Sequence, residues 1–185
     1  MRELTQLTDY AKSFTGLTAE KEAILLAAGP EIKPGLPEVT KRFYDRLQAI
    51  ERTAPYIDGR LAALKATHKS WLEGLFSGPF DAAYTEAMYS VGSVHVKVGL
   101  PVEFMSGGMS LIGEELISLV DRVFNDDPKR IRELLKSINA VMGFSLLIMQ
   151  QSYQSASLAS ELERFLAITG MSRALFDNLA GAYKS

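Results

Sequence analysis

The chain has 185 residues, of which 47% are hydrophobic and 23% are charged, a composition typical of a globular domain. A net charge of −2 and a pI near 5.8 exclude the polybasic surface of nucleic-acid-binding proteins and argue against docking on anionic lipid. The lack of cysteine excludes disulfides, thiolate metal sites and cysteine nucleophiles.

The opening residues, MRELTQLTDY, lack the apolar core of a signal peptide. The longest apolar run, residues 140–149, is too short to cross a bilayer. We therefore expect a cytoplasmic protein with neither a membrane nor a nucleic acid as its partner.

Helical periodicity runs through nearly the whole chain, so the predicted fold class is all-α. A short helix is expected over residues 3–15, and a second begins after the capping residue Thr18 and ends at Gly29-Pro30. A third helix follows the break at residues 33–37 and ends at Thr53-Ala54-Pro55.

Two further helices each follow a predicted aspartate cap, Asp58 before the helix that carries His68 and Asp81 before the helix that carries His95. Pro101 begins a longer helix, and residues 125–128 form a turn before the last long helix. Both long helices are apolar on more than one face. We expect one face to pack in the core and the other to form a homodimer with a second copy; burial within the monomer is the open alternative.

From Leu158 onward the apolar positions advance in steps of four and three residues, a coiled-coil spacing whose polar middle includes Gly170. The chain is therefore divided into a domain over residues 1–157 and a helical extension or signalling linker over residues 158–185. The extension is predicted either to lead into a further domain, or to fold back on the core or form a frayed tail.

The chain has only two histidines, which helical spacing aims inward from consecutive helices. Gly92, one turn before His95, would let a bulky flat group approach the backbone. No carboxylate cluster accompanies either imidazole, so haem suits this site better than a bare cation. Two core histidines, each bonded to a backbone carbonyl, are the alternative.

Three stretches resemble the haem domain of globin-coupled sensors, which are relatives of the protoglobins: RFYDRL (42–47), HKSWLEGLFSGPFDAAY (68–84) and SVGSVHVKVGLP (90–101). The motif GxxHxxxGL is matched in full by Gly92, His95, Gly99 and Leu100. The resemblance implies a globin fold with an extra N-terminal helix and a C-terminal helical extension, and haem b as the cofactor.

The resemblance further implies that His95 is the proximal haem ligand and that Tyr44 contacts the bound gas on the distal side. His68 lies on the distal helix, where it could be a sixth iron ligand, hydrogen-bond a bound gas beside Tyr44, or rotate outward. The other residues expected to line the haem are Leu64, Met88, Val91, Gly92 and Val98.

The expected function is sensing without catalysis. The domain would detect a diatomic gas (O2 first, with NO or CO as further possibilities) or the redox state, and pass a conformational signal to an output module absent from this chain. Two alternatives stay open: a haem-free globin-like scaffold acting through protein contacts, and a stand-alone haem enzyme acting on NO or peroxide.

Overall fold

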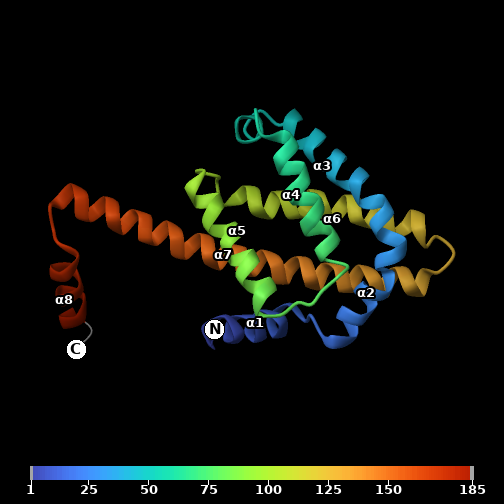
Figure 1. Ribbon diagram of the computed structural model, residues 1–185, viewed down its shortest axis with the longest axis horizontal. Coiled ribbons are helices and arrows are strands. Elements are labelled where there is room, and N and C mark those ends of the chain that lie inside the picture. The colour runs from blue at the N-terminus through green and yellow to red at the C-terminus, as the bar shows by residue number, and fades with distance from the viewer. Residues whose placement is uncertain (1, 184–185) are drawn as a thin grey trace.

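The computed structural model describes residues 2–183 of the 185-residue chain (Figure 1). Within this range the chain forms α-helices and two short 3-10 turns but no strand, so the predicted all-α class is confirmed. The helices are α1 (Arg2–Thr15), α2 (Ala19–Ile32), α3 (Leu36–Ala49), α4 (Leu61–Gly74), α5 (Ala82–Lys97), α6 (Glu103–Val123), α7 (Pro128–Thr169) and α8 (Arg173–Tyr183).

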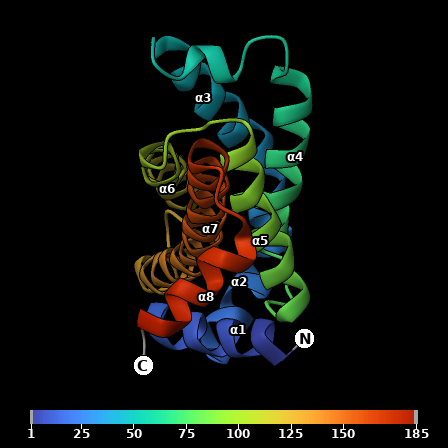
Figure 2. The ribbon, with the colours of Figure 1, turned by 90° about the vertical axis from the view of Figure 1, so that its left-hand side faces the viewer.

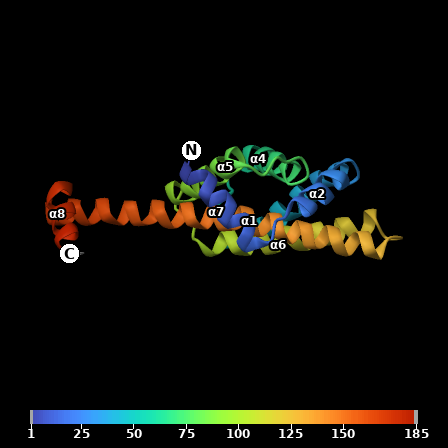
Figure 3. The same ribbon diagram turned by 90° about the horizontal axis from the view of Figure 1, so that it is seen from below.

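The long helix α7 runs through the middle of the molecule and organises the other helices around it. Helix α6 lies on one side of α7, and α4 and α5 lie on the other (Figures 2 and 3). Helix α3 packs against both α4 and α6, while α1 packs against α5 and α7. The two helices that carry histidines are therefore neighbours on one side of the central helix.

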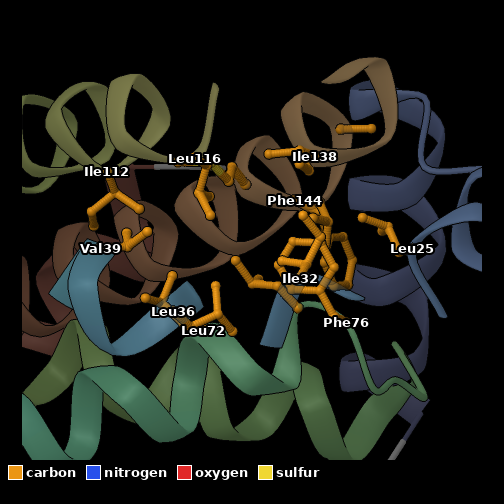
Figure 4. Close-up of a cluster of buried hydrophobic side chains, with 14 of the residues drawn as sticks. Leu25, Ile32, Leu36, Val39, Leu72, Phe76, Ile112, Leu116, Ile138 and Phe144 are labelled. Carbon is orange, nitrogen blue, oxygen red and sulfur yellow. The ribbon is translucent and has the colours of Figure 1, made fainter. Parts of the chain in front are cut away.

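The hydrophobic core lies where α2, α3, α6 and α7 meet the end of α4 and the turn that follows it (Figure 4). Apolar residues at helical spacing on each element face this region, which is how the amphipathic pattern of the sequence determines the packing. Its fully or almost fully buried members include Leu25, Ile32, Leu36, Leu72, Phe76, Leu116 and Phe144.

Two predicted helix caps, Thr18 and Asp81, are confirmed, and Asp127 caps α7 from within the turn predicted at residues 125–128. The Thr18 hydroxyl accepts a hydrogen bond from a backbone N–H at 3.3 Å, and the Asp127 carboxylate accepts one at 2.9 Å. The Asp81 carboxylate accepts two, at 2.9 and 3.1 Å, and so fixes the start of the helix that carries His95. Each cap satisfies N–H groups that have no partner within the helix.

The predicted end of the second helix at Gly29-Pro30 is wrong, because α2 continues through Pro30 to Ile32. Ile32 is completely buried, so core packing outweighs the hydrogen bond that proline removes. Gly29 allows the backbone at Phe76 to approach α2 closely, since a Cβ on residue 29 would lie 2.7 Å from the Phe76 carbonyl oxygen.

The predicted cap at Asp58 is also wrong. Helix α4 begins at Leu61, and Arg60 occupies the cap position without a side-chain cap. The Arg60 guanidinium instead donates to the Tyr56 carbonyl oxygen at 2.8 Å. A 3-10 turn over Ala54–Tyr56 occupies this stretch, so the helix starts later than the aspartate suggests.

Helix α7 passes residues 157 and 158 without interruption and ends at Gly170, whose φ of +69° favours glycine. The chain then turns, and α8 lies across the end of α7 rather than on the core (Figure 1). The Phe165 and Phe176 rings meet edge to face there, with centroids 6.4 Å apart. No helix among the described residues has both the length and the apolarity needed to span a membrane.

Candidate functional site

His68 projects from α4 into an aromatic environment supplied largely by α3. The Phe43 ring stacks on the imidazole, with centroids 4.8 Å apart and planes inclined by 13°. The Tyr44 ring meets it edge-on at 5.6 Å, and Trp71 lies at the same distance on the helix of His68 itself. His68 therefore points inward, and the predicted alternative of an outward rotation does not occur in this structure.

A hydrogen bond fixes the orientation of the His68 ring. Its Nδ1 lies 3.1 Å from the Thr40 hydroxyl oxygen, while its Nε2 is buried without a hydrogen-bond partner among the described residues. When Nδ1–H donates to Thr40, Nε2 carries the free lone pair. Burial lowers the pKa of His68 to about 4, so the ring is neutral at pH 7. A neutral imidazole oriented through its other nitrogen is the form that ligates a metal.

Tyr44 lies beside His68 on α3 and is only 6% exposed. Burial raises the pKa of its hydroxyl to about 12, so the phenol keeps its proton at neutral pH and can donate a hydrogen bond. The structure thus brings together the two residues that the sequence predicts on the distal side.

His95 lies near the C-terminal end of α5 and is half-buried. Its Nδ1 is buried and has no hydrogen-bond partner in the part of the chain that the structure describes, and burial lowers the pKa of the ring. The helix ends two residues after it, at Lys97: Gly99 adopts a φ of +66°, and the N–H of Leu100 donates to the His95 carbonyl at 2.9 Å. The second imidazole is thus also neutral at pH 7 and directs an unpaired nitrogen inward.

The predicted apolar lining divides into two groups. Met88 is 7% exposed, and Leu64 and Val91 pack partly buried against the core. Val98, the residue that follows α5, is 39% exposed and lies at the surface.

The prediction for Gly92 is wrong in its physical reason. A Cβ at this position would overlap the carbonyl oxygen of Met149 and lie 2.8 Å from the Cβ of Ser152. The glycine therefore allows the backbone of α5 to contact α7, and the group in the place of its missing side chain is the backbone of a helix. A glycine within a predicted helix indicates that another group can approach the helix backbone closely, but it does not indicate whether that group is a cofactor or a second helix.

Three residues of the site were not assigned a role by sequence reasoning: Thr40, Phe43 and Trp71. Thr40 is 4% exposed and lies one turn before Tyr44. A polar residue within the apolar stripe of a helix indicates a buried hydrogen bond, and this is the signal in the sequence that could identify Thr40. The Trp71 indole nitrogen is buried on the same helix as His68, and its hydrogen-bonding neighbour is Tyr84.

The donor set fits a haem. An unpaired buried polar atom costs about 1–3 kcal/mol, and two such atoms belong to imidazoles on neighbouring helices. Within residues 2–183 no group of three histidine, aspartate or glutamate side chains could hold a bare metal ion. Two surface cavities, of about 390 and 490 Å³, are lined by other residues. Axial imidazoles with apolar walls are what a porphyrin requires from a protein.

Comparison with known proteins identifies the family and the solved folds that the chain resembles. The sequence model described as Protoglobin matches residues 4–159. The chain is 29% identical over 118 residues to the heme-based aerotactic transducer HemAT of Halobacterium salinarum. That match covers 62% of this chain but 24% of the relative, so the chain corresponds to about a quarter of that protein.

Solved structures agree on the fold. The globin domain of the Geobacter sulfurreducens globin-coupled sensor superposes with a TM-score of 0.73 at 28% identity, over 78% of this chain and 96% of that domain. The ferric globin domain of E. coli DosC gives a TM-score of 0.67 at 15% identity, over 79% of this chain and 99% of that domain. The second match shows the fold alone.

Proposed function

The chain belongs to the protoglobin family, and from that premise we propose that it is the haem-binding sensor domain of a gas-responsive protein. One observation carries the proposal: inward-facing imidazoles on α4 and α5 each have a buried ring nitrogen that no other described group satisfies. The names of two relatives, a heme-based aerotactic transducer and a globin-coupled sensor, support the same class of function.

The proposed cofactor is haem b, held by His95 as the proximal ligand. Its iron would supply the coordination position at which a diatomic gas binds. Neutral His95 offers a lone pair at physiological pH because burial lowers its pKa. Leu64, Met88 and Val91 are proposed to supply the apolar walls, and the more exposed Val98 their outer edge.

On the distal side we assign separate roles to Tyr44 and His68. The Tyr44 hydroxyl stays protonated and donates a hydrogen bond to the gas. His68, oriented by Thr40, offers Nε2 as a sixth ligand when no gas is bound. O2 is the proposed physiological gas, because HemAT is an aerotactic transducer; NO and CO fit the same donor.

The domain acts in this proposal by transmitting a conformational change and not by catalysis. The outer faces of α6 and α7 form a homodimer, and the extension over residues 158–185 connects to an output domain. The exposed apolar side chains of Ile117 on α6 and Leu158 on α7 support an interface on these helices.

Hemin titration of the wild type and of His95→Leu tests the proposal. The wild type is expected to bind one hemin per chain with a Soret band, and His95→Leu to bind at least roughly tenfold more weakly. Val94→Leu, an exposed position on the same helix, is the control and should bind as the wild type does. Equal hemin affinity in all three proteins would contradict the role of His95.

A further inference from the structure

Helix α5 is attached to α7 by side-chain hydroxyls as well as by apolar packing. The Tyr84 hydroxyl lies 2.8 Å from the Ser145 hydroxyl, and Ser93 lies 2.9 Å from Ser152. Ser152 also donates to the backbone carbonyl of Tyr89. Ser145 and Ser152 are completely buried, so these bonds are shielded from competition with water.

The direction of each bond follows from counting protons. Ser145 donates its only proton to the Val141 carbonyl, 2.9 Å away in its own helix, so Tyr84 must be the donor to Ser145. Ser152 donates to the Tyr89 carbonyl, and Ser93, which lies 3.5 Å from that carbonyl but 2.9 Å from Ser152, donates over the shorter distance to Ser152. Each hydroxyl therefore has a defined partner across the helix crossing, which fixes the rotation and the register of α5 on α7.

The contact is closest around Gly92, where the backbones of α5 and α7 touch. Ser93 follows Gly92 directly, and His95 is two residues further along the same helix. By contrast, His68 is hydrogen-bonded through Thr40 to α3, a helix on its own side of the site. The two imidazoles are therefore attached to different parts of the fold.

Helix α7 continues without interruption from Ser152 to Thr169, a length of about 25 Å at 1.5 Å per residue. An unbroken helix transmits a shift or rotation along its axis, whereas a loop would absorb it. A displacement of α5 near His95 would thus reach the C-terminal end of α7 through the crossing at Ser152.

We infer that Gly92, Ser93, Ser152 and the Tyr89 carbonyl form a hydroxyl clamp that positions the proximal helix on α7 and couples a change at His95 to the extended end of α7. Ser93 and Ser152 are positioning residues in this inference, since they act through the helix that carries His95. The inference rests on the proposed haem site.

The test uses a matched pair of double variants. The clamp variant, Ser93→Ala with Ser152→Ala, removes one hydroxyl from each helix at the crossing. The control variant, Ser90→Ala with Ser137→Ala, also removes one hydroxyl from each helix, but those hydroxyls bond only within their own helices. Amide hydrogen exchange is measured by mass spectrometry on the wild type and both variants.

In the protein without added haem, the clamp variant should exchange the amides of α5 roughly fivefold faster than the control. In reduced, hemin-loaded protein, CO should change the exchange of both α5 and residues 153–169 in the wild type and the control. In the clamp variant the change should remain within α5. If the double variant does not fold, Ser93→Ala alone replaces it, with Ser90→Ala as its control.

An equal response of residues 153–169 in the clamp and control variants would overturn the inference, as would a wild type in which CO changes α5 but not α7. A protein that acquires no Soret band with hemin, or whose band CO does not shift, would contradict the proposed function instead. The absorption spectrum, recorded on the same samples, separates the two failures.

Discussion

His68 and His95 have the same side chain but different surroundings. A threonine orients His68 and three aromatic rings surround it, whereas His95 lies near a helix end with its Nδ1 unpartnered among the described residues; both side chains are half-buried. Both rings are uncharged at pH 7 because burial disfavours the protonated form. The orientation of the His68 ring is therefore fixed by more contacts than that of the His95 ring.

Burial of His68 predicts acid sensitivity of the protein without haem. The pKa falls from an ordinary 6.5 to about 4 on folding, so between these values the unfolded chain binds a proton that the folded chain does not. Stability is therefore lost as the pH falls from 6.5 to 4, by roughly 2–3 kcal/mol from this group. Urea unfolding at pH 7, 5 and 4 should show a shallower pH dependence in His68→Leu. An unchanged dependence would mean that His68 titrates normally.

Gly92 gives a prediction that does not involve the cofactor. Gly92→Ala should destabilise the folded chain by roughly 3 kcal/mol, because its methyl group overlaps the Met149 carbonyl of the facing helix. Gly107→Ala, at an exposed position in α6 with nothing within 4 Å, should instead stabilise by up to about 1 kcal/mol. Thermal or urea unfolding of both variants measures the difference, and similar stabilities would refute the close crossing.

The sequence predicts which helices form, and in what order, better than it predicts the residues at which they begin and end. The caps at Thr18 and Asp81 and the turn before α7 are found as predicted because each depends on interactions within four residues. The end of α2 and the start of α4 are missed, because burial of Ile32 and the 3-10 turn before Arg60 depend on distant packing. Local chemistry can be read from one segment, whereas tertiary packing cannot.

The same distinction applies to the candidate site. Helical spacing predicts that His68 and His95 point inward, and the structure agrees for both. Spacing does not reveal that Thr40 orients His68 from a position on another helix, nor that α7 is what approaches Gly92. These contacts join residues far apart in the sequence, so no periodicity encodes them.

The C-terminal helix α8 contacts α7 through few side chains. The contribution of a single contact to its attachment can therefore be measured with one substitution. Phe176→Ala removes the edge-to-face contact with Phe165, so α8 should detach and trypsin should cleave at Arg173 roughly fivefold faster. Global unfolding should change by less than about 0.5 kcal/mol. Leu179→Ala, at a position 54% exposed, is the control and should be cleaved at the wild-type rate. Equal cleavage of both variants would show that the aromatic contact does not hold α8.

For the whole molecule, the proposed dimer accounts for apolar surface that the monomer leaves uncovered on α6. Ile117 is 53% exposed, and Ile117→Asp should weaken dimerisation by at least roughly tenfold, because an unpaired carboxylate is costly to bury. Light scattering should then report a mass near the 20.4 kDa of one chain. Val94→Asp, with a similar exposed fraction of 51% on α5, should leave the dimer intact. A wild type that is already monomeric at micromolar concentration would contradict the interface.

The globin fold, the two buried imidazole nitrogens and the long α7 support the proposal of a sensor in which a haem held between α4 and α5 responds to a gas. The absorption spectrum of the reduced, hemin-loaded protein, before and after addition of CO, tests this claim most directly. We expect a Soret band that CO shifts saturably. Before CO is added, the ferrous spectrum of the wild type should be six-coordinate, and that of His68→Ala should be five-coordinate. A protein that acquires no Soret band, or whose band does not respond to CO in either protein, would contradict it.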